Sequence, residues 1–158
     1  MIQGKLLTYG DDLKEVYSIR RKVFVEEQNI PEEDEFDSTD NEAIHVLIYE
    51  QNSVSDTINR IAVATGRIIF DGETCEISHI AVIKEYRNMK YGDLAVRMLI
   101  NKAFTAGINK VQVNSPLELL DFFKSIGFTF LKDNSENSDN SLYKMVIYIN
   151  NVNTSCKK

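Results

Sequence analysis

The feature that most limits the fold of this chain is a strand-like segment that passes through a short basic loop into a long amphipathic segment. Cys75 to Ile83 has the length and composition of a strand, and Tyr91 to Ala106 gathers its polar positions on one side, as a surface helix does. Gly107 is suited to end such a helix, and a short strand, Lys110 to Asn114, follows it. A strand, a crossover helix and a second strand predict parallel pairing between the two strands.

The loop between this strand and this helix has the properties of a phosphate-binding site. The first N–H groups of a helix have no acceptor within the helix, and the helix dipole favours negative charge near them. Arg87 and Lys90 add two positive charges to the loop. The loop and the first helical turn therefore predict a pyrophosphate site held mainly by backbone N–H groups. Taken alone, the loop leaves open an ordinary strand-to-helix turn with solvated charges.

The rest of the chain predicts further strands and helices around this unit. Apolar residues recur at helical spacing at the start of the chain, and strand-like runs flank the Asp71-Gly72 turn signal. The expected helices are residues 11–27, 91–106 and 117–126, and the expected strands are residues 44–50, 60–70, 75–83, 110–114, 128–132 and 142–149. The acidic stretch from Asn29 to Glu42, which contains Pro31, is expected to be a loop, with or without a short helical turn. This order predicts a mixed α/β fold in which helices pack on one mostly antiparallel sheet.

Length and charge limit the classes of function. The 158 residues fit one domain, expected over residues 1–150, with a polar tail at residues 151–158. A net charge of -6 argues against a nucleic-acid partner, because phosphate binding requires clustered basic charge. Apolar runs fall far short of the roughly 20 residues of a membrane span, and the first residues lack the layout of a secretory signal. We therefore expect a cytoplasmic protein without a membrane partner.

The cysteines and histidines show no metal-site spacing. Cys75 and Cys156 are the two cysteines, and no further ligand types recur near them at the intervals of a zinc site. We expect two free thiols and no metal cofactor.

Five blocks of the sequence resemble one enzyme family. In chain order they are Arg20-x-x-Val23-Phe24-Val25-x-Glu27-Gln28, Glu35-x-Asp37-x-x-Asp40-x-x-Ala43-x-His45, Ala64-Thr65-Gly66-Arg67-Ile68, Arg87-Asn88-Met89-Lys90-Tyr91-Gly92 and Phe122-Phe123-x-x-x-Gly127-Phe128. Together they resemble a bacterial subgroup of the GNAT superfamily of acetyl-CoA-dependent N-acetyltransferases, over about residues 13 to 131. The fourth block is similar to the family's acetyl-CoA signature, which is Arg or Gln, two residues, Gly, any residue, then Gly or Ala. Lys90 departs from it, since the family usually has glycine there.

The resemblance implies a fold and a donor site. The implied fold is a six- or seven-stranded, mostly antiparallel sheet that splays open at its central parallel strands and is flanked by about four helices. The implied cofactor is acetyl-CoA, whose pantetheine arm would lie in the split. The residues implied to bind it are Ile80, Ala81, Val82, Arg87, Asn88, Met89, Lys90, Tyr91, Gly92, Asp93 and Phe123. At Lys90, the side chain either obstructs the approach of a phosphate or replaces a backbone contact with a charge.

The resemblance also implies direct attack of an amine on the thioester, which requires a general base. Glu76 occupies the place where some GNAT enzymes keep a glutamate base, and we rank it first. His79 ranks second, because an imidazole titrates near neutral pH. Alternation along a strand puts Glu76, Ser78 and Ile80 on one face, unless a bulge resets the phase, so Ser78 is a third candidate. A solvated glutamate and a structural histidine are the alternatives.

The acid and the acceptor are less defined. Many GNAT enzymes have a tyrosine where this chain has Phe123, so water or another group would protonate the thiolate; Tyr86 and Tyr143 are unsupported candidates. The carboxylates between Glu32 and Asp40 form either an acidic lip for a cationic amine or a solvated loop. Arg20 is expected either to snorkel or to pair structurally, and Arg67 is expected either to face the cleft and bind a carboxylate or to line the sheet.

Three functions follow from these features. The first is acetylation of a primary amine on a small molecule or a lysine. The second is a degenerate GNAT fold that senses acyl-CoA without catalysis. The departures from the family at Lys90, at Phe123 and at Pro116, where the family often has asparagine, favour it. The third, ranked last, is a relative of the acyl-homoserine-lactone synthases. The sequence leaves open the acceptor, the acyl chain and whether the chain forms a homodimer.

Overall fold

The computed structural model describes residues 1–54, 57–131 and 142–149. Its strands are β1 (Ile2–Leu7), β2 (Ile44–Val54), β3 (Thr57–Asp71), β4 (Thr74–Val82), β5 (Lys110–Pro116), β6 (Thr129–Phe130) and β7 (Leu142–Tyr148). Its α-helices are α1 (Lys14–Arg20), α2 (Glu32–Glu35), α3 (Tyr91–Thr105) and α4 (Leu120–Ile126). A π-helix, η1 (Arg21–Glu27), continues α1, and short 3-10 turns are η2 (Ser38–Asn41), η3 (Lys84–Tyr86) and η4 (Leu117–Leu119).

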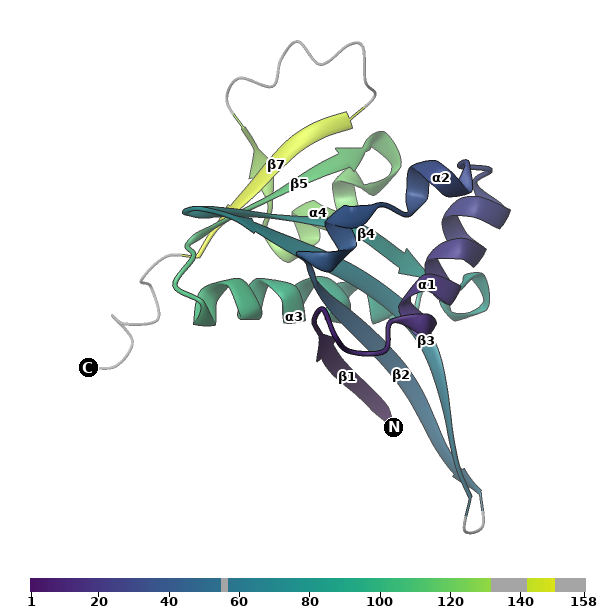
Figure 1. The fold of residues 1–158 in the computed structure, drawn as a ribbon. Coiled ribbons are helices and arrows are strands. Elements are labelled where there is room, and N and C mark those ends of the chain that lie inside the picture. The colour runs from purple at the N-terminus through teal and green to yellow at the C-terminus, as the bar shows by residue number, and fades with distance from the viewer. Residues whose placement is uncertain (55–56, 132–141, 150–158) are drawn as a thin grey trace, which may run out of the picture.

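Within the described residues the strands form one seven-stranded sheet in the order β1-β2-β3-β4-β5-β7-β6. All neighbours are antiparallel except β4 and β5, which the α3 crossover makes parallel. The expected mixed fold, with a mostly antiparallel sheet of seven strands flanked by four α-helices, is confirmed in this part of the chain (Figure 1).

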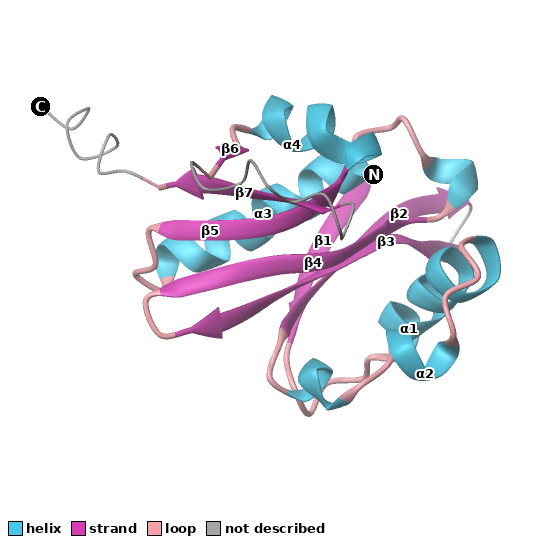
Figure 2. Ribbon diagram, turned by 90° about the horizontal axis from the view of Figure 1, so that it is seen from above, coloured by secondary structure: helices cyan, strands magenta, loops and turns pink. Residues whose placement is uncertain are grey.

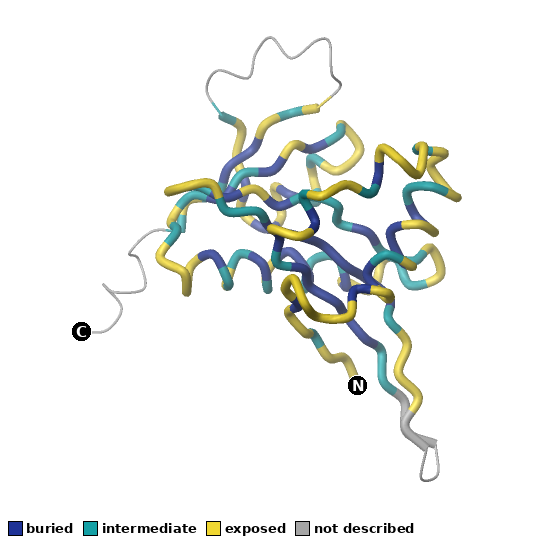
Figure 3. Tube along the Cα trace, in the orientation of Figure 1, coloured by how far each residue is buried: buried dark blue, intermediate teal, exposed yellow. Residues whose placement is uncertain are grey.

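Helices cover both faces of the sheet and create two separate cores (Figure 2). The larger core lies between the sheet and α3 with α4, where Leu99 of α3 and Phe123 of α4 are buried against Ile77 and Val113. The smaller core lies under α1 and η1, where Val16 and Val23 are buried. Buried positions concentrate in the central strands and on the inner sides of the helices (Figure 3).

The sheet splits where β4 and β5 part. The two strands pair over only three rungs, Cys75 with Val111, Glu76 with Gln112, and Ile77 with Val113. Beyond the last rung, β5 continues to pair with β7 through Pro116, and in the described part of the chain the segment of β4 from Ser78 to Val82 has no partner strand on that side. The splay that the family resemblance implies is therefore present.

A bulge in β4 interrupts its alternation just after the split begins. The register with β3 joins Arg67 to Ser78 but Thr65 to Ala81, so two residues of β4, His79 and Ile80, stand opposite the single residue between them. His79 has a φ of 55°. The bulge resets the phase, so Ile80 joins Ile77 on the face covered by α3 and α4, while Glu76 and Ser78 face α1. The simple alternation expected for Glu76, Ser78 and Ile80 is thus wrong at Ile80.

Several parts of the chain add to or depart from the expected elements. The first residues form the edge strand β1, which pairs with β2 and was not predicted. The acidic stretch, for which a loop with or without a short helical turn was expected, holds two short helical turns, α2 and η2. The predicted strand 128–132 is confirmed only at Thr129–Phe130, and the proposed polar tail at 151–158 lies outside the described residues. Among the described helices, none is both long and apolar enough to cross a membrane.

Candidate active site

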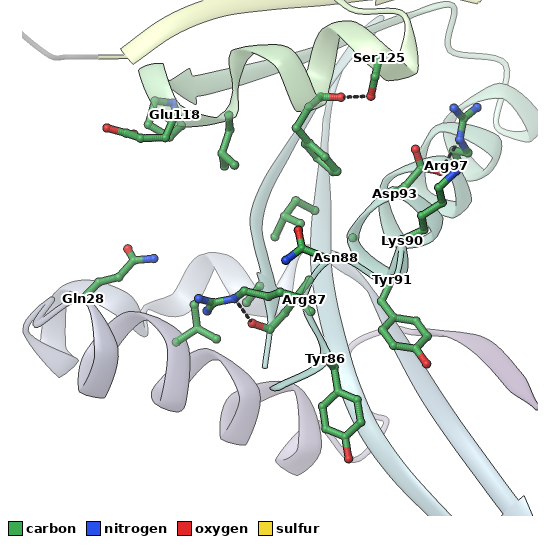
Figure 4. Close-up of a pocket in the computed structure, with 18 residues that line it drawn as sticks. Gln28, Tyr86, Arg87, Asn88, Lys90, Tyr91, Asp93, Arg97, Glu118 and Ser125 are labelled. Atoms are coloured by element: carbon green, nitrogen blue, oxygen red, sulfur yellow. Dashed lines mark hydrogen bonds and ion pairs between the residues drawn. The ribbon is translucent and has the colours of Figure 1, made fainter. Parts of the chain in front are cut away.

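A cavity of about 1010 Å³ lies at the split and reaches the first turn of α3 (Figure 4). Its walls come from four places: β4 with the loop that follows it, the start of α3, η1 with the residue after it, and the end of β5 with η4 and α4. The lining residues are Val23, Gln28, Ile80, Ala81, Val82, Tyr86, Arg87, Asn88, Lys90, Tyr91, Gly92, Asp93, Arg97, Pro116, Glu118, Leu119, Phe122 and Ser125. A cavity of this size accepts a cofactor rather than only a small ion.

The start of α3 presents unsatisfied backbone donors to this cavity. The first helical hydrogen bond runs from Leu94 N–H to the carbonyl of Lys90, at 3.0 Å, so the N–H groups of Tyr91, Gly92 and Asp93 have no acceptor inside the helix. No side chain caps the helix. Because these donors and the helix dipole meet at one point, the geometry suits a diphosphate.

The backbone conformation at Lys90 is one that favours glycine, the residue that the family signature has at this position. Lys90 has a φ of 66°, in the left-handed region that favours glycine. Asn88, two residues earlier, has a φ of 65°, which asparagine tolerates better than most residues. The lysine side chain is exposed, lines the cavity, and has no ion-pair partner among the described residues. Its ammonium is therefore available to a ligand.

Arg87 is engaged by the protein itself. Its Nη1 and Nη2 donate to Oε2 and Oε1 of Glu27 at 2.6 and 2.7 Å, and its Nε donates to the carbonyl of Val82 at 3.0 Å. Glu27 raises the pKa of the Arg87 guanidinium, and the hydrogen bond from Arg87 lowers the pKa of Glu27. From the sequence, Arg87 was expected to offer its charge to a phosphate. Its pairing with Glu27 was not predicted, because 60 residues separate the two.

The other residues implied to bind the cofactor divide into two groups. Ile80, Ala81, Val82, Asn88, Gly92 and Asp93 line the cavity, and so does Tyr91, whose hydroxyl hydrogen bonds to Glu50. This bond raises the pKa of Tyr91 to about 12. Met89 is exposed and lies outside the lining.

Phe123, which the family resemblance implies to bind the cofactor, does not line the cavity. Phe123 is buried in the larger core, where its ring packs edge-on against Phe122 and Phe128. Phe122 lines the cavity instead. In a helix, adjacent side chains point about 100° apart, so the two phenylalanines cannot share one face, and the sequence alone did not decide between them.

The three candidate catalytic side chains lie beside the split on the face of α1, but none lines the cavity. Glu76 is exposed at the middle rung of the β4–β5 pairing, and its Oε1 accepts a hydrogen bond from Asn114 Nδ2 at 3.3 Å. Ser78 and His79 touch each other, with 3.1 Å between Ser78 Oγ and His79 Nδ1.

Ser78 and His79 belong to a buried polar ring, formed by Arg20, Glu35, Asp40, Arg67, Ser78 and His79. Arg20 donates to Glu35 and to Asp40, both at 2.7 Å. Arg67 donates to Asp40 at 2.7 Å and to Ser78 Oγ at 3.1 Å. The His79 Nε2 atom lies 3.6 Å from Glu35 Oε2, which closes the ring.

The buried polar ring removes two carboxylates, Glu35 and Asp40, from the acidic lip that the sequence left open, whereas Glu32, Glu33, Asp34 and Asp37 are exposed. Glu35 and Asp40 are only 5% and 2% exposed, and both face arginines rather than solvent or a substrate. Burial acts to raise the pKa of Asp40, but hydrogen bonds from Arg20 and Arg67 outweigh it and the pKa is lowered. Arg67 is also committed to the ring, so it is not free to bind a carboxylate in the cleft.

His79 is neutral at physiological pH in this setting. Burial first, and then the charges of Arg67 and Arg20, lower the pKa of His79 to about 4. Since Arg67 donates to Ser78 Oγ, the Ser78 hydroxyl hydrogen can be donated to His79 Nδ1. The neutral imidazole is therefore a weak proton acceptor, and Ser78, Glu35 and Phe24 contact it from β4, α2 and η1.

Solved structures with the same fold define the class of protein. Escherichia coli ElaA superimposes with a TM-score of 0.74, at 24% identity, over 93% of this chain and 99% of that chain. The PaiA N-acetyltransferase of Thermoplasma acidophilum, whose structure is a complex with coenzyme A, has a TM-score of 0.66 at 13% identity, over 94% of this chain and 99% of that one. The fold is that of the GNAT acyltransferases.

Sequence comparison gives the family. The profile of the Acetyltransferase (GNAT) family matches residues 13–128. The uncharacterized protein YyaT of Bacillus subtilis is 31% identical over 127 residues, which are 78% of this chain and 80% of YyaT. The chain belongs to the GNAT acetyltransferase family and is an acyltransferase.

Proposed function

We propose that this enzyme transfers an acetyl group from acetyl-CoA to a primary amine, on a small molecule or a lysine, in the cytoplasm. One observation carries the proposal: the unsatisfied N–H groups at the start of α3 and the unpaired edge of β4 line the same cavity of about 1010 Å³. The N–H groups suit the diphosphate of CoA. The edge from Ser78 to Val82 suits an amide-containing arm that pairs with backbone.

The amine would attack the thioester carbonyl directly, without a covalent enzyme intermediate. For this the amine must be neutral and held close to the carbonyl. The face of the sheet toward α1 carries Glu76, Ser78 and His79 beside the split, and Glu76 is exposed there, so the acceptor would approach from the side of α1. As the amine adds, its proton passes to a base and the thiolate leaves with a proton from water.

Glu76 remains the first candidate for the base. It is exposed and has one long hydrogen bond, from Asn114, so its carboxylate can reorient toward an amine or an intervening water. His79 is a weaker candidate because its pKa is lowered to about 4. For the acid, Phe123 offers no hydroxyl; Tyr86 lines the cavity, whereas Tyr143 packs against Phe130 on β6.

Turnover with a panel of amines tests the proposal. CoA release, measured as free thiol, is followed for the wild type, Glu76→Gln and a matched control, Glu73→Gln, which removes an exposed carboxylate at the nearby β3–β4 turn. We expect Glu76→Gln to lower kcat by about 100-fold or more, as loss of a general base does, and Glu73→Gln to retain activity. Full activity of Glu76→Gln would refute the base assignment. Binding of CoA without thiol release from any amine would favour the sensor.

A further inference from the structure

The pair formed by Glu27 and Arg87 joins η1 to the loop before α3, and Arg87 lines the cavity. Glu27 is the last residue of η1, and Arg87 belongs to the loop that leads into α3. Two hydrogen bonds join them end to end, at 2.6 and 2.7 Å. Their side chains are 35% and 34% exposed, so both can exchange partners without unfolding the core.

The Nε atom of Arg87 also covers the unpaired edge of β4. The N–H of Ile83 bonds to the carbonyl of Val63, at 2.9 Å, on the side of β3. In an extended strand the hydrogen-bonding groups of successive residues point to opposite edges, so the carbonyl of Val82 faces the split. Arg87 Nε donates to this carbonyl (Figure 4). Arg87 therefore sits where the edge of β4 and the loop before α3 meet.

The donors of Arg87 define what it can bind. A guanidinium has five N–H groups in a planar fork. Three of them are used, one on Val82 and two on Glu27. The two that Glu27 receives form the bidentate arrangement that a phosphate also prefers. A diphosphate at the start of α3 and the carboxylate of Glu27 thus compete for the same two N–H groups of the Arg87 guanidinium.

The position of Glu27 at the end of η1 does not itself favour a carboxylate. A carboxylate at the C-terminal end of a helix faces the negative end of the helix dipole, which is unfavourable unless a cation compensates it. In the described part of the chain, Arg87 is the cation paired with Glu27. The Glu27 carboxylate therefore binds the Arg87 guanidinium as an anionic ligand would, close to the unsatisfied N–H groups at the start of α3.

We propose that Glu27 competes with the diphosphate for Arg87. When the ligand binds, the two guanidinium hydrogen bonds of Arg87 pass from Glu27 to a phosphate. Glu27 is then a positioning residue that weakens donor binding and favours release of the CoA product. The proposal depends on the cavity being the CoA site. It predicts that removal of the Glu27 charge strengthens the binding of any ligand with a diphosphate.

Calorimetry with CoA and with ADP tests this, because ADP carries a diphosphate without the pantetheine arm. Glu27→Gln should bind both ligands about three- to tenfold more tightly than the wild type, the range expected when a partly exposed ion pair no longer competes. Glu27→Asp, which keeps the charge but shortens the side chain, should fall between them. Glu32→Gln is the matched control, since Glu32 forms a similar pair with Arg21 at 2.6 Å, outside the cavity.

The outcomes separate this proposal from the proposed function. If the wild type binds CoA and Glu27→Gln binds it equally or more weakly, Glu27 is not a competitor, and the pair only holds the loop in place. If Glu27→Gln and Glu32→Gln strengthen binding alike, the effect is one of net charge and the proposal fails. If no variant binds CoA at millimolar concentration, both the proposed function and this proposal are refuted. Pantetheine, which has no phosphate, should bind the wild type and Glu27→Gln equally; tighter binding to the variant would contradict a role for the diphosphate.

Discussion

Replacement of Lys90 by glycine should stabilise the protein. Lys90 has a φ of 66° and an exposed side chain, so the backbone is strained and the side chain contributes little packing. The left-handed conformation costs an L-residue about 1 to 2 kcal/mol relative to glycine. Glycine in turn adds about 0.4 to 1 kcal/mol of entropy to the unfolded chain. The net gain is about 0.5 to 1 kcal/mol.

The matched variant is Lys90→Ala, which removes the same charge but keeps the Cβ atom. In a domain of this size a change of 1 kcal/mol shifts Tm by roughly 2 to 4 °C. By differential scanning calorimetry, Lys90→Gly should therefore melt about 1 to 4 °C above the wild type and above Lys90→Ala. Equal Tm values for the two variants would refute the argument from backbone strain.

The same two variants decide what Lys90 does for the ligand. If its Cβ atom keeps a phosphate away from the loop, Lys90→Gly binds CoA more tightly than Lys90→Ala. If its ammonium replaces a backbone contact, both variants bind CoA more weakly than the wild type, and more so at low salt. We expect the second result, because the ammonium lines the cavity and has no ion-pair partner among the described residues.

Three further predictions concern the ring, its histidine and the start of α3. Asp40→Asn leaves two buried guanidinium groups without their shared charge, so it should destabilise the protein by about 3 to 5 kcal/mol in urea unfolding, whereas the exposed control Glu32→Gln should cost about 1 kcal/mol or less. His79 has a folded pKa of about 4, below the unfolded value of about 6.5, so its contribution to stability is present above pH 6.5 and is lost as the pH falls toward 4, by up to about 3 kcal/mol. His79→Asn, whose side chain tolerates the φ of 55°, should flatten the stability profile between these pH values; an unchanged slope would contradict the assigned cause. Gly92→Ala has room for its Cβ, 3.4 Å from the nearest atom of Val82, and should raise stability by about 0.5 to 1 kcal/mol as alanine does in a helix; a loss of stability would show that the space is not there.

The strand–loop–helix unit and the topology around it could be predicted from sequence because their signals are local. Periodicity, the glycine after α3 and the order of elements were enough to place β4, α3 and β5 and to expect their parallel pairing. The edge strand β1 was missed although its residues alternate, since a short alternating run at a chain end carries little weight without a neighbour. Its pairing with β2, 38 to 48 residues away, supplies that neighbour.

The buried polar ring could not be predicted, because its energetics depend on pairs distant in sequence. In the sequence, Glu35 and Asp40 look like members of a solvated acidic loop. Their ion pairs with Arg20 and Arg67 offset the free-energy cost of burying the two carboxylates. The bulge at His79 had a similar cause: Gly66 on β3 stands opposite two residues of β4, which no pattern in β4 alone specifies.

Most residues proposed for the donor side gather around one cavity, whereas the residues proposed for the acceptor side do not line it. The backbone of the loop and of β4 was located from motif and strand signals, and the cavity is lined by most of those residues. The choice between Phe122 and Phe123 and the pairing of Glu27 with Arg87 required the packing of distant elements. The acceptor side depends on side chains of the sheet face, whose exposure changes with a one-residue shift of register.

The most direct test of the account is a crystal structure of the protein with CoA. We predict that the diphosphate lies within hydrogen-bonding distance of the N–H groups of Tyr91, Gly92 and Asp93, and that the pantetheine arm lies along β4 between Ser78 and Val82. A structure at saturating CoA in which the split is empty, or in which CoA is ordered elsewhere on the protein, would contradict the central claim.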